Sequence, residues 1–216
     1  MASSTPPFDA KAIPTPEELA KAGQLDLLNL DGEKVKFGSV FESEKVIIVF
    51  IRHFFCGSCL AYVENLTKVP KEALEAADTR IVVVGCGEAK FIKTYKETSG
   101  FQGDVYADPS RAVFRAMGMT LENLKLNPPE EKRASYLRDQ GILTIVFDGI
   151  RRALRSPTLI GKQGNIFQLG GEFVLGPGNK CSFVARMEHT MQHASVEEVM
   201  QAAGVEWKEE VASGQQ

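Results

Sequence analysis

The chain has 216 residues, of which 44% are hydrophobic, and its 25 basic and 28 acidic side chains give a net charge of -3. This length and apolar content are enough for one domain with a sizeable core. The basic residues form no block that would follow a phosphate backbone, which argues against nucleic acid as a partner. The first residues lack the features of an export signal, and no apolar run is long enough to span a bilayer. We therefore expect a cytoplasmic protein with no membrane partner.

Four cysteines occur, at positions 56, 59, 86 and 181. They are too few and too unevenly spaced for the disulfide framework of a small secreted module. Structural zinc needs about four ligands, and the chain has a single CxxC pair, with no second pair of ligand spacing among its three histidines. We expect no bound metal and no bound cofactor, and a redox role for the paired cysteines.

In chain order, residues 1–16 carry four prolines and predict a flexible N-terminal segment before a domain over 17–207. Thr15 and Pro16 are typical of the cap and first residue of a short helix. Two short strands are expected over residues 25–30 and 34–40, with Asp31-Gly32 in the hairpin between them.

The β-branched run over residues 45–51 predicts a strand buried on both faces of a parallel sheet. Apolar residues at helical spacing follow from Ser58 to Pro70, so the cysteine motif lies where a buried strand leads into a helix. The alternation continues with a helix over 70–77, a strand over 80–84, a helix over 88–98, a strand over 104–107 and a helix opened by Asp108. In such a sheet ligand sites lie at the carboxyl ends of the strands, so Cys56 and Cys86 should share one edge.

Residues 121–162 break this alternation and are interpreted as an insertion, with an amphipathic helix over 142–154. Closing strands are expected over 165–169, 172–175 and 181–185. A last helix over 195–203 has Ser195 as its cap, with Glu198 three residues on. Residues 208–216 form a flexible C-terminal tail in this interpretation.

The candidate site is Cys56-Gly57-Ser58-Cys59, preceded by Arg52 and His53. A thiolate is the reactive form of cysteine, and a helix N-terminus and nearby cations both favour it. Cys56 has these surroundings, while Cys59 lies one helical turn on and can resolve an oxidised Cys56. A chance CxxC in a buried helix is the alternative, and the strand before the motif and the helix after it argue against chance. The sequence leaves two roles open for His53, a partner of the thiolate or a surface side chain.

The remaining polar candidates have simpler explanations. Cys86 and Cys181 are expected to be packing residues, and Asp108 to be a helix cap. A solvated polar turn is the favoured interpretation of Arg186, His189 and His193.

Several segments together resemble the peroxiredoxin-like 2 family, the CxxC-containing branch of the AhpC/TSA superfamily. The resemblance covers about residues 25–205. It is carried by residues 49–59, which contain Arg52, His53 and the Cys56-Gly57-Ser58-Cys59 motif, by residues 105–109 and 117–119, and by residues 169–176. Residues 181–194 look like the fungal-type members.

The resemblance implies an α/β, thioredoxin-like three-layer sandwich with a central mixed sheet and a helical insertion. It also implies reduction of peroxides or of an endoperoxide through the CxxC thiols, with electrons from an external thioredoxin-like donor and ultimately from NADPH. The chain differs from true peroxiredoxins, because Val49 and His53 replace the Pro and Thr of their PxxxTxxC motif. Thioredoxin's cis-proline has no evident match either, since Gly170-Gly171 stand near its expected place.

We therefore expect a thiol-dependent oxidoreductase that reduces a peroxide, endoperoxide or disulfide, with Cys56, Cys59, Arg52 and His53 as catalytic residues. Two alternatives stay open. One is a specialised biosynthetic enzyme acting on a bulky apolar substrate, with the insertion as its lid. The other is a non-catalytic binding or dimerisation module, which a normal Cys56 pKa would favour; the substrate, the electron donor and the oligomeric state, including a homodimer, are open as well.

Overall fold

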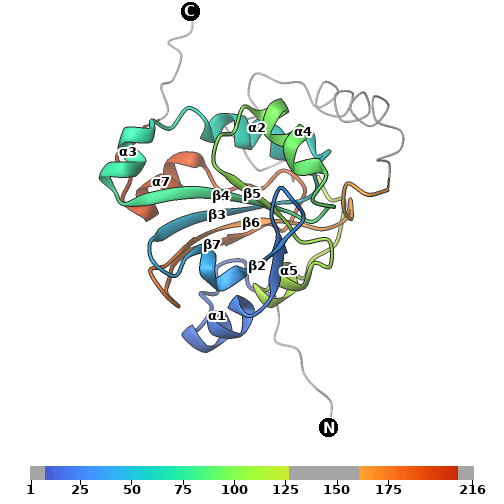
Figure 1. Cartoon of the computed structure of the whole chain (residues 1–216), viewed down its shortest axis with the longest axis horizontal. Coiled ribbons are helices and arrows are strands. Elements are labelled where there is room, and N and C mark those ends of the chain that lie inside the picture. Colours follow the sequence, from blue (N-terminus) through green and yellow to red (C-terminus); the bar gives the residue numbers. More distant parts are fainter. Residues whose placement is uncertain (1–7, 127–160, 209–216) are drawn as a thin grey trace, which may run out of the picture.

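The computed structural model describes residues 8–126 and 161–208 of the chain. In this part of the chain seven strands form one sheet, in the order β2-β1-β5-β4-β3-β6-β7 (Figure 1). The strands are β1 (Asp26–Leu28), β2 (Lys34–Lys36), β3 (Lys45–Ile51), β4 (Thr79–Gly85), β5 (Asp104–Ala107), β6 (Gly171–Leu175) and β7 (Cys181–Arg186).

The central strands run parallel and the outer strands antiparallel. β3 pairs with β4 and β4 with β5 in parallel register, whereas β1, β6 and β7 join antiparallel. The predicted buried run is β3 itself, and all its residues after Lys45 are buried. The mixed α/β sheet of a thioredoxin-like fold is therefore confirmed.

Helices cover both faces of the sheet (Figure 1). Alternate residues of β3 point to opposite faces: Ile47, Val49 and Ile51 pack with the helices α2 (Gly57–Leu66), α4 (Phe91–Ser99) and α7 (Val196–Ala203). Val46, Ile48 and Phe50 pack on the other face with α1 (Pro16–Gly23), the 3₁₀ helix η1 (Phe37–Val40) and α5 (Ala112–Ala116). The short helix α3 (Lys71–Ala76) precedes β4. Within the described ranges, no helix has both the length and the apolar content to cross a membrane.

The predicted caps are confirmed. The Thr15 hydroxyl accepts from Glu18 N while the Glu18 carboxylate accepts from Thr15 N, a reciprocal cap of α1. Ser195 accepts from Glu198 N at the start of α7. Asp108 is buried and accepts from the backbone N–H groups of Ala112, Val113 and Phe114. The N–H groups that this carboxylate caps lie four to six residues after Asp108. The helix α5 therefore begins at Ala112 and not directly after Asp108.

Several predicted boundaries differ from the structure. The second strand ends at Lys36, since residues 37–40 turn as η1, and the helix expected from residue 88 begins at Phe91. Residues 165–169 form no strand; they contribute an isolated bridge between Glu122 and Gln168, because their backbone turns at Asn165. The helix expected over 142–154 lies outside the described residues.

The segment 161–166 lies against the carboxyl ends of β3 and β4. Phe54 N donates to Gln163 O at 3.1 Å, and Glu88 N donates to Lys162 O at 3.0 Å. Two glycines permit this approach: a Cβ on Gly87 would stand 2.4 Å from Gln163 O, and one on Gly164 would stand 2.6 Å from Cys86 Sγ. Gly164 also has a backbone φ of +109°, an angle that residues with a side chain rarely adopt. The contact thus depends on the absence of side chains on both segments.

We expect Gly164→Ala to lower the free energy of unfolding by about 2–4 kcal/mol, since it adds a steric clash to backbone strain. Gly161→Ala is the matched control, because Gly161 has a φ of +86° but open space around its Cβ position. It should cost only the strain, about 1–2 kcal/mol. Urea denaturation measures both, and an equal loss in the two variants would contradict the close contact of Gly164 with Cys86.

Candidate active site

Cys56 is the N-cap residue of α2, after a four-residue turn that follows the end of β3. Its backbone is extended, with φ -69° and ψ 113°, and its sulfur accepts a hydrogen bond from Cys59 N at 3.4 Å. A sulfur in this position meets an unpaired N–H group and the positive end of the helix dipole. The connection from β3 to α2 therefore places Cys56 at a helix N-terminus, where a thiolate is favoured.

Three side chains add to this stabilisation. The Cys59 thiol donates to Cys56 Sγ across a sulfur–sulfur distance of 2.9 Å, Arg52 Nη1 donates at 3.5 Å, and Ser58 Oγ lies 3.2 Å away. The hydrogen bond from Cys59 holds the pKa of Cys56 well below its ordinary value, against the effect of burial, and the Arg52 guanidinium and the Ser58 hydroxyl act in the same direction. Cys56 is thus the thiol that ionises first.

Cys59 has the opposite character. It is fully buried, and burial, reinforced by its hydrogen bond to the Cys56 sulfur, raises its pKa well above the ordinary value. Arg52 N donates to its sulfur at 3.5 Å. Both cysteines are free thiols in the structure. The motif therefore places a sulfur that favours the thiolate in direct contact with one that favours the thiol.

His53 is buried, with 9% of its surface exposed, and so does not lie at the surface. Burial lowers its pKa to about 4. The imidazole is therefore neutral at pH 7, and Arg52 is the residue that supplies a permanent positive charge beside Cys56. Within the described ranges His53 Nδ1 and Arg52 Nε have no hydrogen-bond partner.

Ser58 was not singled out from the sequence, although it lies inside the motif. Its hydroxyl reaches both Cys56 Sγ and the carbonyl oxygen of Thr190, the latter at 3.1 Å. A hydroxyl has a single proton to donate. When Cys56 is a thiolate, the two acceptors compete for that proton, which links the sulfur to the turn before α7.

The other cysteines behave as predicted packing residues. Cys86 follows β4 on the same sheet edge as Cys56 and donates to Arg52 O at 2.8 Å. Burial raises the pKa of Cys86 to about 12 and that of Cys181 to about 11. Both are therefore protonated at neutral pH and poor nucleophiles.

The polar turn before α7 is buried, which corrects the prediction of a solvated turn. Arg186, His189 and His193 are each no more than 7% exposed. The Arg186 guanidinium donates to the carbonyl oxygens of Met117, Asp9 and Ala12, and this stretch of the expected flexible lead-in is thereby bonded to the sheet. Tertiary contacts, which local polarity does not reveal, account for the difference.

Glu172 is a second residue that the sequence analysis missed. Its carboxylate is fully buried on β6, bonded to His193 Nδ1 and accepting from Ala194 N at 3.1 Å. The His193 ring stacks on Tyr62 with centroids 4.3 Å apart, and Tyr62 is one helical turn after Cys59 on α2. A charged residue within an otherwise apolar strand was the available signal.

The buried imidazole of His53 should make folding sensitive to acid. Because its folded pKa of about 4 lies below the unfolded value of about 6.5, its contribution to stability is present above pH 6.5 and is lost as the pH falls towards 4. We compare the Cys56→Ser protein, which keeps His53, with the double variant Cys56→Ser/His53→Phe. Between pH 6.5 and pH 4 the free energy of unfolding should fall by up to about 3 kcal/mol more in the protein that keeps His53. Denaturation at pH 7 and pH 4 tests this, and equal losses in the two proteins would contradict it.

Comparison with known proteins places the chain in a family. The model of the AhpC/TSA antioxidant enzyme family matches residues 65–189. Peroxiredoxin-like 2C of Mus musculus is 31% identical over 195 residues, covering 87% of this chain and 80% of the mouse protein. Prostamide/prostaglandin F synthase of Xenopus laevis is 24% identical over 194 residues, covering 87% of this chain and 89% of that protein.

Solved structures share the fold. Peroxiredoxin Q of Xanthomonas campestris superposes with a TM-score of 0.56 at 13% identity, covering 89% of this chain and 92% of the other. At this identity the likeness concerns the fold alone. Together, the matched residues and the mouse relative show that the chain belongs to the AhpC/TSA antioxidant enzyme family as a peroxiredoxin-like 2 member, with thiol oxidoreductase as its class of function.

Proposed function

We propose that this chain reduces organic hydroperoxides or endoperoxides, with Cys56 as the attacking thiolate and Cys59 as the resolving thiol. The observation that carries the proposal is the convergence of donors on Cys56 Sγ: Cys59 N, the Cys59 thiol and Arg52 Nη1 all point at one sulfur, with the Ser58 hydroxyl beside it. A two-electron reduction of a peroxide by a thiol pair needs a thiolate that attacks and a second thiol that then forms the disulfide. Cys56 and Cys59 are in contact and have these two properties.

In the first step the Cys56 thiolate attacks one peroxide oxygen. A sulfur–oxygen bond forms, the oxygen–oxygen bond breaks, and the leaving alkoxide takes a proton to become an alcohol. A hydroperoxide attacked at its terminal oxygen leaves Cys56 as a sulfenic acid, whereas an endoperoxide, whose two oxygens both stay bonded to carbon, leaves Cys56 as a sulfenate ester. In both cases Cys56 loses two electrons and the peroxide gains them. The positively charged Arg52 guanidinium stabilises both the thiolate and the departing oxyanion.

In the second step Cys59 resolves the sulfenic acid. Loss of the Cys56 thiolate removes the negative charge that disfavours ionisation of Cys59. The Cys59 sulfur then attacks Cys56 Sγ and a disulfide forms. The oxygen bound to Cys56 leaves with the Cys59 proton, as water from the sulfenic acid or as the second alcohol group of the substrate from the sulfenate ester. A thioredoxin-like dithiol donor, itself reduced at the expense of NADPH, returns two electrons by thiol–disulfide exchange. We place this cycle in the cytoplasm, where such donors keep thiols reduced.

The preference for a bulky organic group rests on two observations. Val49 and His53 replace the residues that orient small peroxides in true peroxiredoxins, and His53 is neutral and buried. Ile166 and Phe167 are 40% and 46% exposed, and the Ile166 carbonyl oxygen accepts from Arg52 at 2.6 Å. Apolar contacts beside the catalytic arginine can thus supply the positioning of a large substrate. The prostaglandin-related name of the Xenopus laevis relative agrees with an endoperoxide as one such substrate.

A non-catalytic binding module is the competing function. It would need inert cysteines with ordinary pKa values. The lowered pKa of Cys56 favours the redox function over this alternative.

Cys56 should be the first thiol to react with iodoacetamide at pH 7, ahead of the other three cysteines. Arg52→Ala should raise the apparent pKa of Cys56 by about one pH unit, because it removes the permanent cation, and Arg52→Lys should restore part of the effect. Alkylation across a pH series, read by mass spectrometry of the peptides, measures both. Preferential labelling of Cys59 or Cys86 would refute the assignment of the nucleophile.

The reduced protein should react faster with cumene hydroperoxide than with hydrogen peroxide in stopped-flow experiments. Phe167→Ala should slow the reaction with cumene hydroperoxide about fivefold, by removing about 1 kcal/mol of apolar contact, and leave that with hydrogen peroxide unchanged. Leu30→Ala is the matched control, because Leu30 is a similarly exposed apolar residue, in the turn between β1 and β2. Faster reaction with hydrogen peroxide, or an equal effect of the two substitutions, would contradict the proposed preference.

A further inference from the structure

The Arg52 guanidinium makes two contacts that differ in strength. Nη1 donates to Cys56 Sγ at 3.5 Å, and Nη2 donates to the carbonyl oxygen of Ile166 at 2.6 Å. The guanidinium is planar and rigid, so fixing one nitrogen determines the direction of the other. The position of the Ile166 carbonyl therefore sets how Arg52 meets the Cys56 sulfur.

The Ile166 peptide is held in a turn by Asn165. Asn165 Oδ1 accepts from Phe167 N at 2.9 Å, and the backbone oxygen of Asn165 accepts from Gln168 N at 3.2 Å. On the preceding side, Gln163 O accepts from Phe54 N. Ile166 is thus held on its amino-terminal side by the Gln163 carbonyl contact and, closer in sequence, by the hydrogen bonds of Asn165.

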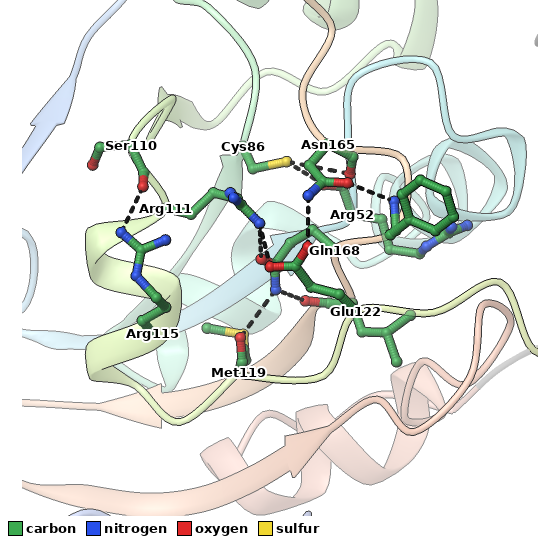
Figure 2. Close-up of polar contacts among 11 residues, drawn as sticks. Arg52, Cys86, Ser110, Arg111, Arg115, Met119, Glu122, Asn165 and Gln168 are labelled. Atoms are coloured by element: carbon green, nitrogen blue, oxygen red, sulfur yellow. Dashed lines mark hydrogen bonds and ion pairs between the residues drawn. The ribbon is translucent and has the colours of Figure 1, made fainter.

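The Asn165 side chain is in turn fixed by a charged pair outside the cysteine motif (Figure 2). Asn165 Nδ2 donates to Glu122 Oε2 at 2.7 Å, and Arg111 Nη1 donates to Glu122 Oε1 at 2.5 Å. Arg111 also reaches Gln168 Oε1 at 3.4 Å, and Gln168 Nε2 donates to Met119 O at 3.0 Å. Both carboxylate oxygens of Glu122 are therefore used, one towards Arg111 and one towards the turn.

We infer that Glu122 and Asn165 are positioning residues that hold Arg52 against the Cys56 sulfur through the Ile166 carbonyl. The inference rests on the role proposed for Cys56 as the attacking thiolate and names residues that act on it indirectly. Arg111 supports Glu122 in this arrangement. Neither positioning residue touches Cys56 or Cys59 in the contacts that the described chain makes, although the Cys86 thiol donates to the backbone oxygen of Asn165 at 3.8 Å.

The sign of one substitution separates this role from simple electrostatics. A negative charge near a thiolate disfavours it, so the charge of Glu122 acting through space would raise the pKa of Cys56, and its removal would lower that pKa. Loss of positioning acts in the opposite direction, because Arg52 is released from the sulfur. Glu122→Gln should therefore raise the pKa of Cys56 if the positioning role holds.

The test is the pH dependence of Cys56 alkylation by iodoacetamide in the full chain, read by mass spectrometry. We expect Glu122→Gln and Asn165→Ala each to raise the apparent pKa of Cys56 by about half to one pH unit, or about three- to tenfold in the ionisation constant. Glu44→Gln is the matched control, because Glu44 accepts from Arg80 at 2.7 Å with similar exposure, next to the amino-terminal ends of β3 and β4. It should leave the pKa of Cys56 unchanged.

An Arg52→Met background completes the test. If Glu122 acts through Arg52, Glu122→Gln has no further effect on the pKa of Cys56 once the guanidinium is gone. An unchanged or lowered pKa in both Glu122→Gln and Asn165→Ala, or an equal rise with and without Arg52, would overturn the inference. Because the readout is alkylation, a failure to reduce peroxides would refute the proposed function and leave this result standing.

Discussion

A thiolate in a nearly closed site is the constraint on which the other features of this molecule depend. Cys56 is only 5% exposed, and burial by itself would keep its thiol protonated. The negative charge is offset by donors from three sources: the first turn of α2, the Cys59 thiol within the motif, and Arg52 at the end of β3. The position of the motif at the end of a buried strand brings all three to one sulfur.

Neighbouring groups of the same chemical type have different roles because their surroundings differ. Of the two residues before the motif, Arg52 keeps its charge, whereas burial makes His53 neutral at pH 7. Of the cysteines, Cys56 is pushed towards ionisation, while Cys59 and Cys86 are held protonated by burial. The order of events proposed for the reaction, attack by Cys56 and resolution by Cys59, follows from this difference. Because Arg52 is the cation beside the Cys56 sulfur, the surrounding structure has to keep its guanidinium oriented towards that sulfur.

Much of the fold could be predicted from the sequence because its signals are local. The buried run of β3, the caps at Thr15, Asp108 and Ser195, and the shared edge of Cys56 and Cys86 all depend on residues close in sequence or on a regular alternation. Contacts between distant segments could not be predicted: Ile166 meets Arg52 across 114 positions, and Glu172 meets His193 inside the core. Residues 165–169 combine apolar and polar residues as a strand would, yet the Asn165 side chain bonds to its own backbone and makes a turn. The turn before α7 is polar in sequence, but packing buries it.

The central claim is that Cys56 and Cys59 form a redox pair within one chain. The most direct measurement is peptide mapping by mass spectrometry after the fully reduced protein has reacted with one equivalent of cumene hydroperoxide, with free thiols blocked at once. The sulfurs lie 2.9 Å apart, so little movement is needed to reach the bonding distance of about 2.05 Å. The account predicts a single intramolecular disulfide between Cys56 and Cys59, with Cys86 and Cys181 blocked as free thiols. A disulfide from Cys56 to Cys86 or Cys181, or a protein whose four cysteines all stay reduced, would contradict it.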